Sequence, residues 1–242
     1  MRLDKFLANE NIGSRKEVGV LIRSGAVTVN GQAVKKADAQ IDAEKDEICV
    51  NGKPVRYNEF VYLLMNKPSG VLTATRDNRA KTVLDLIPPE LKRKDLFPAG
   101  RLDKDTTGLL IITDDGDFAH RMLAPKSHVM KRYEAVLDLP AEAADIKRFA
   151  EGIDSGEDHF APAVLEIDET DPHRAWVEIR EGKFHQVKRM FRACGKTVVE
   201  LRRLSIGALI LEDTLNAGEV RVLKTEEAQL VFQTKTSVRN DT

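Results

Sequence analysis

The order in which strand-like and helix-like segments follow one another most limits how this chain can fold. Short apolar runs typical of buried strands alternate irregularly with amphipathic segments typical of helices. No repeating strand-helix-strand unit, the pattern that builds a parallel sheet, connects them. The order predicts an α+β domain over residues 58–235, built on a mostly antiparallel β-sheet flanked by helices. Its expected strands are Val61–Met65, Leu109–Thr113, Tyr133–Leu137, Val164–Ile167, Ala175–Ile179, Val198–Leu201 and Leu209–Leu211, and its expected helices are Thr82–Ile87, a segment marked by Phe118, Met122 and Leu123, Ala141–Glu151 and Phe184–Ala193.

A small helix and hairpin domain is predicted for residues 1–57. Ser14-Arg15-Lys16-Glu17 has the form of a capping box, so a helix should run from Arg15 to about Ser24, after an earlier helix over Leu3–Asn9. Asn30-Gly31, the dipeptide best suited to a type I′ turn, should join two short strands in a hairpin. Basic side chains that we expect on the outside of this unit, available to RNA, are Arg2, Lys5, Arg15, Lys16 and Arg23.

Length and composition describe an ordinary globular protein of one or two domains. The chain has 242 residues, of which 42% are hydrophobic and 32% charged, enough to bury a substantial core. No apolar run approaches the roughly 18 residues of a membrane span, and the first residues lack the pattern of a signal peptide. We therefore expect a cytoplasmic protein with no membrane partner. We also expect a monomer, with a disordered tail over residues 236–242.

The net charge of −1 conceals strong segregation of charge along the chain. Residues 1–36 carry seven basic and three acidic side chains, and residues 180–203 carry eight basic and two acidic ones. Between them, residues 138–171 carry eleven acidic and two basic side chains. Two basic regions separated by an acidic one suggest a positive face that follows a polyanion. Solvated faces whose charges cancel locally are the alternative explanation.

Residues 100–110, which read G-R-L-D-K-D-T-T-G-L-L, contain the candidate reactive group. Asp103 lies between Arg101 and Lys104, just before an apolar run that should form a buried strand. The two neighbouring cations favour the ionised carboxylate. An ionised, positioned aspartate can act as a nucleophile, a base or a metal ligand.

Three interpretations of this stretch follow from its residues alone. Residues 103–114 match the spacing of an EF-hand calcium loop, but a lysine lies inside the loop and strand-like residues stand where a helix should begin. Asp103 and Asp105 on one strand would lie roughly 6–7 Å apart, near the carboxylate separation of glycoside hydrolases. One Trp and three Tyr offer little aromatic surface for a sugar. A buried ion pair of Asp103 with Arg101 is the purely structural alternative.

Four motifs in order resemble those of the ribosomal pseudouridine synthases of the small-subunit synthase A family. They are N-K-P-S-G-V at 66–71, the stretch at 100–110, K-R-Y-E-A at 131–135 and E-G-K-F-H-Q-V-K-R-M-F at 181–191. The likeness extends from about Tyr62 to Val231. The N-terminal residues, with S-R-K-E and R-S-G-A-V-T-V-N-G, resemble the small RNA-binding domain named after ribosomal protein S-four. This resemblance implies an isomerase that converts a uridine of rRNA to pseudouridine.

The resemblance also implies roles for particular side chains. Asp103 corresponds to the nucleophile, and Tyr133 to the active-site tyrosine that stacks on the uracil and is a candidate base for its C5 proton. Lys188 corresponds to the basic residue that supplies the counter-charge, with Arg189 as the alternative. The reaction exchanges one bond for another within a nucleotide, so no cofactor is expected. No metal is expected either, because His185 lacks a second ligand at metal-binding spacing. Further residues expected to contact RNA are Lys67, Arg101, Lys104, His185, Gln186 and Arg189.

The expected partner is rRNA of the small ribosomal subunit, naked or in an assembling particle. Large-subunit rRNA is the alternative substrate. A non-catalytic RNA-binding or ribosome-assembly protein would carry similar basic surfaces, and is the alternative from another class.

Overall fold

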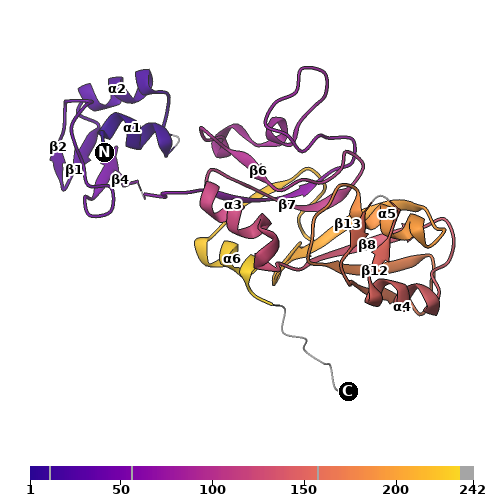
Figure 1. Ribbon diagram of the computed structural model, residues 1–242. Helices are drawn as coiled ribbons and strands as arrows, with labels where there is room; N and C mark the ends of the chain where they lie inside the picture. The colour runs from indigo at the N-terminus through magenta and orange to yellow at the C-terminus, as the bar shows by residue number, and fades with distance from the viewer. Residues whose placement is uncertain (11, 56, 157, 235–242) are drawn as a thin grey trace. The chain divides into compact units, whose positions relative to one another are not determined.

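The computed structural model describes residues 1–10, 12–55, 57–156 and 158–234, which form two compact units (Figure 1). One unit comprises Met1–Val61 together with Ile87–Leu96, and the other comprises Tyr62–Leu86 and the chain from Phe97 onward. The boundary expected between residues 57 and 58 stays a prediction. The tail expected at residues 236–242 lies outside the described residues.

The first unit packs two helices against a small antiparallel sheet. Helix α1 spans Leu3–Asn9 and helix α2 spans Arg15–Arg23. The predicted capping box is present: the Ser14 hydroxyl accepts from the backbone N–H of Glu17, and the Glu17 carboxylate accepts from that of Ser14. The strands follow the order β2-β1-β3-β4. Their bounds are Val27–Val29 for β1, Gln32–Ala33 for β2, Ile48–Val50 for β3 and Lys53–Pro54 for β4.

Two tight turns of the same kind shape this sheet. Asn30 and Gly31, between β1 and β2, have φ angles of 51° and 78°, as the predicted type I′ turn requires. Asn51 and Gly52 repeat the pattern between β3 and β4, with φ angles of 50° and 76°. The core beneath is apolar and consists of Leu3, Phe6, Leu7, Val18, Ile22, Val27, Ile41 and Ile48.

The second unit is built on a mixed sheet in which, among the described residues, nine strands take part. The strand order is β11-β12-β8-β13-β7-β5-β15, with β14 paired to β13 and β6 paired to β7. The pair β13 and β7 is parallel, and the other pairs of this sheet are antiparallel. The predicted α+β domain on a mostly antiparallel sheet is therefore confirmed. The bounds are Tyr62–Lys67 (β5), Phe97–Ala99 (β6), Thr107–Thr113 (β7), Lys131–Leu137 (β8), Val164–Ile167 (β11), Arg174–Ile179 (β12), Val198–Ile206 (β13), Leu209–Ile210 (β14) and Val220–Leu223 (β15).

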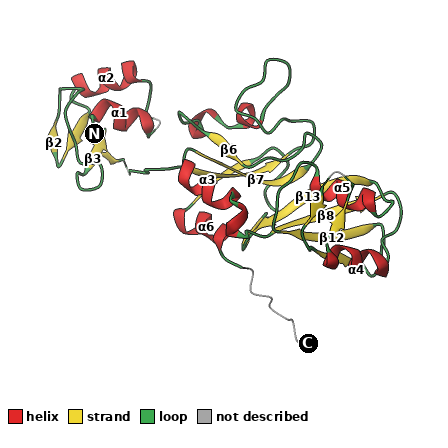
Figure 2. Cartoon of the chain, in the orientation of Figure 1, coloured by secondary structure: helices red, strands yellow, loops and turns green. Residues whose placement is uncertain are grey.

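Helices and short turns flank this sheet, as Figure 2 shows. The helices are α3 (Gly116–Leu123), α4 (Ala143–Glu151), α5 (Gln186–Ala193) and α6 (Thr225–Gln229). The 3₁₀ turns are η1 (Val83–Leu86), η2 (Pro89–Leu91, in the first unit), η3 (Pro125–Ser127) and η4 (Leu230–Phe232), and a small hairpin pairs β9 (Ile153–Asp154) with β10 (His159–Phe160). Three expected helices differ: the segment Thr82–Ile87 contains a 3₁₀ turn in place of an α-helix, and α4 and α5 each begin two residues later than predicted.

Apolar packing holds each end of the sheet. Helices α3 and α6 lie side by side in Figure 1, and Phe118 and Ala228 from them pack with Tyr62 and Leu109 of the sheet. At the other end, α4 and α5 meet through Phe149 and Phe191, whose ring centroids are 4.9 Å apart. None of the helices in the described part of the chain combines the length and apolar character that crossing a membrane requires.

Candidate active site

The loop that carries Asp103 is held in place by the side chain of Lys67. Lys67 ends strand β5 and is completely buried. Its ammonium donates to four backbone carbonyl oxygens, those of Pro68 (3.1 Å), Asp103 (3.0 Å), Lys104 (3.2 Å) and Thr106 (2.8 Å). Burial lowers the pKa of this ammonium to about 8. The prediction that Lys67 contacts RNA is wrong, because its charged end is enclosed by the loop that it supports.

Further hydrogen bonds join this loop to the segment after β5. The backbone N–H of Gly70 donates to the carbonyl of Lys104 over 2.8 Å. The Thr73 hydroxyl donates to the carbonyl of Leu102 over 2.7 Å. The motifs at 66–71 and 100–110 therefore form one structural unit, in which the first fixes the backbone of the second.

The Asp103 carboxylate faces the beginning of α5. One carboxylate oxygen lies 3.3 Å from Nε2 of His185, and the other lies 3.5 Å from Nζ of Lys188. About a quarter of the Asp103 side chain, 26%, is exposed. His185 is the N-cap residue of α5, so the carboxylate also lies near the positive end of the helix dipole. Asp103 is thus accessible and surrounded by groups that stabilise negative charge.

Lys188, and not Arg189, supplies the cation beside Asp103. The Arg189 guanidinium instead forms an ion pair of 2.6 Å with Asp158 and donates to the Ser155 hydroxyl. Neighbouring residues on a helix point in different directions, which explains why two adjacent cations serve different partners.

Asp105 lies on the other side of Lys188. The ammonium of Lys188 donates to the Asp105 carboxylate over 2.6 Å, and this bond lowers the pKa of the Asp105 carboxyl. Asp103 and Asp105 precede β7 instead of lying on one strand, and both carboxylates face the same cation. The arrangement contradicts a glycosidase-like pair, which needs one carboxyl kept protonated.

The calcium interpretation also fails on geometry. Its twelfth position, Asp114, follows the far end of β7, which spans Thr107–Thr113. An extended strand of this length separates Asp103 from Asp114 by roughly 20 Å or more. Within the described parts of the chain, no group of three or more His, Cys, Asp or Glu side chains could hold a metal ion. Cys49 and Cys194 are both free thiols.

Asp103 and Tyr133 meet in a pocket of about 60 Å³ that His185 also lines. Tyr133 comes from β8 and is 7% exposed. Its hydroxyl accepts from Nη1 of the buried Arg203 over 3.5 Å, and Nε of Arg203 donates to the carbonyl of Leu109. The pocket is smaller than typical ligand pockets of roughly 300–1,000 Å³. A base entering it must widen it.

Two wider hollows open beside this pocket, and Asp103 and His185 line both of them. One, of about 410 Å³, also includes Lys188, and the other, of about 420 Å³, includes Arg101 and Phe184. Asp103 and His185 therefore stand where three hollows meet. The carboxylate is open to the surface through the wider two.

The other predicted RNA contacts divide into exposed and buried groups. Arg101 and Lys104 are exposed and line the wider hollows. Gln186 is buried, and its amide bonds the Glu181 carboxylate and the backbone N–H of Lys183. These bonds fix the turn before α5, and because Gln186 also lines the 60 Å³ pocket, its contact with RNA stays a prediction. In the first unit the basic side chains expected on the surface are exposed, namely Arg2, Lys5, Arg15, Lys16 and Arg23.

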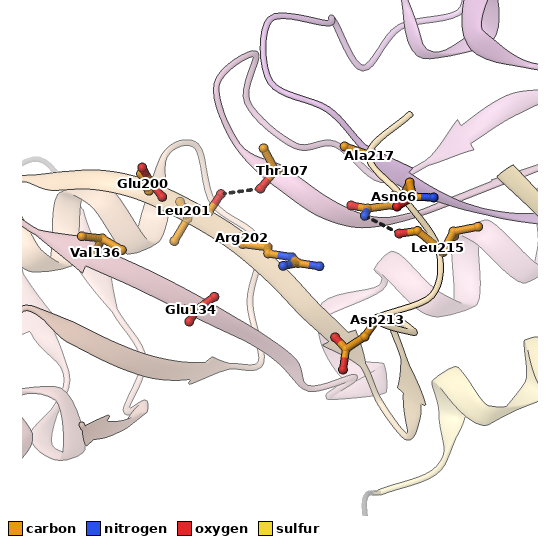
Figure 3. A pocket seen from close by; sticks show the side chains of 11 residues that line it. Asn66, Thr107, Glu134, Val136, Glu200, Leu201, Arg202, Asp213, Leu215 and Ala217 are labelled. Atoms are coloured by element: carbon orange, nitrogen blue, oxygen red, sulfur yellow. Dashed lines mark hydrogen bonds between the residues drawn. The ribbon is translucent and has the colours of Figure 1, made fainter. Parts of the chain in front are cut away.

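A different pocket, of about 450 Å³, lies over strands β8 and β13 and the start of β7 (Figure 3). The side chains drawn there include Glu134, Glu200 and Asp213 beside Arg202. Three carboxylates would repel RNA phosphates, and no expected catalytic residue lines this pocket. The site centred on Asp103 is therefore the better candidate, although it is the narrower cavity.

Sequence reasoning assigned the buried Lys67 to the wrong role and missed the buried Arg203. Lys67 belongs to an apolar strand, and Arg203 shares one face of β13 with the buried Leu201 and Ser205. A charged residue at the inward position of a strand pattern was the available signal. The hydroxyl of Thr106, which lines the 60 Å³ pocket, was missed as well. It is buried without a hydrogen-bond partner in the described structure.

The fold and the partly exposed carboxylate beside Lys188 are compatible with an enzyme that acts on RNA, and sequence comparison names its class. The family described as RNA pseudouridylate synthase matches residues 61–193, and the S4 domain matches residues 1–48. The chain belongs to the RNA pseudouridylate synthase family and is an isomerase that acts on RNA. The resemblance found in the sequence is thereby confirmed.

Named relatives match over nearly the whole chain. The uncharacterized RNA pseudouridine synthase YtzG of Bacillus subtilis is 47% identical over 96% of this chain and 98% of its own. Ribosomal small subunit pseudouridine synthase A of Escherichia coli K12 is 40% identical, covering 94% of this chain and 98% of its own. A crystal structure of a pseudouridylate synthase aligns with a TM-score of 0.65 and 38% identity, over 96% of this chain and 99% of that one.

Proposed function

We propose that this protein isomerises one uridine of small-subunit (16S) rRNA to pseudouridine, with Asp103 as the nucleophile. The observation that carries the proposal is the placement of the Asp103 carboxylate. It is partly exposed, lies 3.5 Å from Lys188, and shares a pocket with Tyr133. Lys67 fixes the backbone beneath it.

The reaction balances within a single nucleotide. An oxygen of Asp103 attacks the ribose at C1′ or the uracil ring, and the bond from C1′ to N1 breaks. The base turns, the bond from C1′ to C5 forms, C5 loses its proton, N1 gains one, and the carboxylate is released unchanged. Nothing is oxidised or reduced, so the proposal includes no cofactor.

The surrounding side chains have separate tasks in this scheme. Lys188 supplies the counter-charge to the Asp103 carboxylate. The ring of Tyr133 stacks on the uracil, and its hydroxyl is the candidate base for the C5 proton. Because the target uridine must leave its stack to reach the pocket, Arg101 and Lys104 would hold the phosphates of the strand around it.

The relatives support small-subunit rRNA as the substrate. Proteins named ribosomal small subunit pseudouridine synthase A from E. coli K12 and Vibrio cholerae are 40% and 41% identical to this chain and match 94% and 96% of it. The proposal takes the RNA naked or in an assembling small subunit, and the enzyme as a cytoplasmic monomer. Large-subunit rRNA remains the alternative substrate.

The test compares wild-type protein with Asp103→Asn and Asp105→Asn on 16S and 23S rRNA transcripts and on partly assembled small subunits. Pseudouridine is mapped at nucleotide resolution, and RNA affinity is measured in parallel. We expect modification of one 16S uridine, its loss in Asp103→Asn with affinity retained, and its persistence in Asp105→Asn. Modification of 23S rRNA alone would support the alternative substrate.

Binding of RNA by the wild type and by Asp103→Asn alike, with modification by neither, would favour a non-catalytic binding protein. Sedimentation of the free protein at several concentrations tests the monomer, and fractionation of cells tests the cytoplasmic location.

A further inference from the structure

The side chain of Phe184 is the most exposed large hydrophobic group among the described residues. It is 70% exposed. Its ring stacks on the imidazole of His185, with centroids 3.8 Å apart and planes 17° apart. An aromatic ring exposed to water is less stable than a buried one, because its apolar surface remains hydrated. Its position at the mouth of a binding site indicates that a ligand covers it.

A strained turn presents this pair of rings. His185 adopts a left-handed conformation with φ of 48° and ψ of 31°, which is unfavourable for a residue other than glycine. The buried amide of Gln186 holds the turn by accepting from the N–H of Lys183 and donating to Glu181. The same turn brings the imidazole of His185 to 3.3 Å from Asp103. The exposed ring of Phe184 is therefore fixed relative to the nucleophile.

Exposed cations line the same hollow as the ring. Phe184 lines the 420 Å³ hollow together with Asp103, Arg101 and Lys104, whereas the ammonium of Lys183 donates to the carbonyl of His159 over 2.6 Å. Basic groups that follow a phosphate backbone, combined with an aromatic face, are the elements of a single-strand binding surface. Stacking of this kind tolerates any base, because every base has a π face.

We propose that Phe184 is a stacking platform for the base next to the target uridine. The inference rests on the proposed function and adds a positioning residue to it. Extruding the uridine leaves its neighbour without a stacking partner, which costs a few kcal/mol in the free RNA. The Phe184 ring takes up that neighbour, and this both stabilises the opened strand and sets its distance from Asp103.

The test replaces Phe184 by Ala and by Trp in full-length protein, with Leu139→Ala as the control. Leu139 is another exposed apolar side chain, 52% exposed, and lines none of the hollows described above. Each change is made in the wild type and in Asp103→Asn, so that affinity is measured with and without turnover. The RNA is the transcript that the wild type modifies, or 16S rRNA if none is modified.

We expect Phe184→Ala to weaken RNA binding roughly 5- to 150-fold in both backgrounds, the range that removal of one stacked base produces. Phe184→Trp should retain wild-type affinity, and Leu139→Ala should change affinity less than twofold. With 2-aminopurine beside the target uridine, the fluorescence quenching on binding should disappear in Phe184→Ala and persist in Phe184→Trp.

Unchanged affinity and quenching in Phe184→Ala would overturn the platform even if pseudouridine forms normally. Conversely, a wild type that forms no pseudouridine would refute the proposed function. The effect of Phe184→Ala on affinity in Asp103→Asn would still decide whether the ring stacks on RNA.

Discussion

The ammonium of Lys67 lies 3.0 Å from the backbone carbonyl oxygen of Asp103. The interaction joins the end of one buried strand to the loop before another, and it positions Asp103 through its backbone. The Asp103 side chain is thereby left for Lys188, His185 and the substrate. One buried cation replaces the several loop interactions that would otherwise be needed to fix this turn.

Replacing Lys67 by Met should both destabilise the protein and misplace Asp103. The substitution leaves four carbonyl oxygens without their donor, and it also removes the cost of burying a charge. Because the first effect is the larger, the free energy of unfolding should fall by about 3 kcal/mol. Chemical unfolding at pH 7 measures this change, and single-turnover kinetics should show a larger loss than stability explains. The exposed Lys81→Met is the control and should leave both quantities near wild type.

The pH dependence of stability should carry the signature of Lys67. Its pKa is about 8 in the folded protein and about 10.5 in the unfolded chain. Between these values the unfolded chain holds a proton that the folded protein has released, so this group makes stability rise with pH, by about 3 kcal/mol in total. The difference in unfolding free energy between wild type and Lys67→Met should be flat below pH 8 and should increase above it. A decrease across that window would contradict the burial of this charge.

Substitutions of Lys188 and Arg189 should affect different properties, the first the rate of the reaction and the second the stability of the fold. Lys188→Met removes the cation beside Asp103 and should lower the single-turnover rate roughly 100-fold. Arg189→Gln breaks the ion pair with Asp158 and should cost about 1 kcal/mol of stability, with less than a threefold change in rate. Both variants are measured at saturating RNA. The reverse ranking would mean that Arg189, and not Lys188, supports the reaction at Asp103.

Gly108 should be irreplaceable for a steric reason. Its φ is 100°, and an added Cβ would lie 2.2 Å from the carbonyl oxygen of Arg203, across the parallel pairing of β7 and β13. Gly108→Ala should therefore lower the free energy of unfolding by roughly 4 kcal/mol or more. Gly116→Ala is the matched control, because its Cβ would meet nothing within 4 Å and alanine favours the helix that starts there. Urea unfolding that left Gly108→Ala as stable as Gly116→Ala would show that the strand pairing can shift.

Local signals made much of the fold predictable. Helix Leu3–Asn9 and the capping box at Ser14 depend on neighbouring residues alone, and both are present as expected. The start of α5 depends on His185, whose left-handed turn is held by Gln186 from inside the fold. Such a tertiary restraint leaves no periodic pattern, so the sequence predicted this helix two residues too long.

The site, like the fold, was only partly predictable from the sequence. The pairing of Asp103 with Lys188 is implied by the resemblance to the family, because two of its ordered motifs each carry one partner. The burial of Lys67 and Arg203 could not be inferred, since it depends on strands that meet from distant parts of the chain. The sequence alone predicts an RNA contact for Lys67. In the folded chain Lys67 is a structural cation.

The exposed cations of the first unit should govern the salt dependence of RNA binding and leave the chemistry untouched. Arg15→Gln combined with Lys16→Gln removes two positive charges that can each neutralise one phosphate. The slope of log affinity against log salt should therefore fall by about 0.7 to 0.9 for each phosphate that is no longer neutralised. Lys45→Gln is the control in the same unit, because that ammonium already lies 3.4 Å from Asp42 and should add little to the slope. Since Asp103 belongs to the other unit, the single-turnover rate at saturating RNA should match wild type. A lower rate with an unchanged slope would mean that these side chains act on the reaction and not on the capture of RNA.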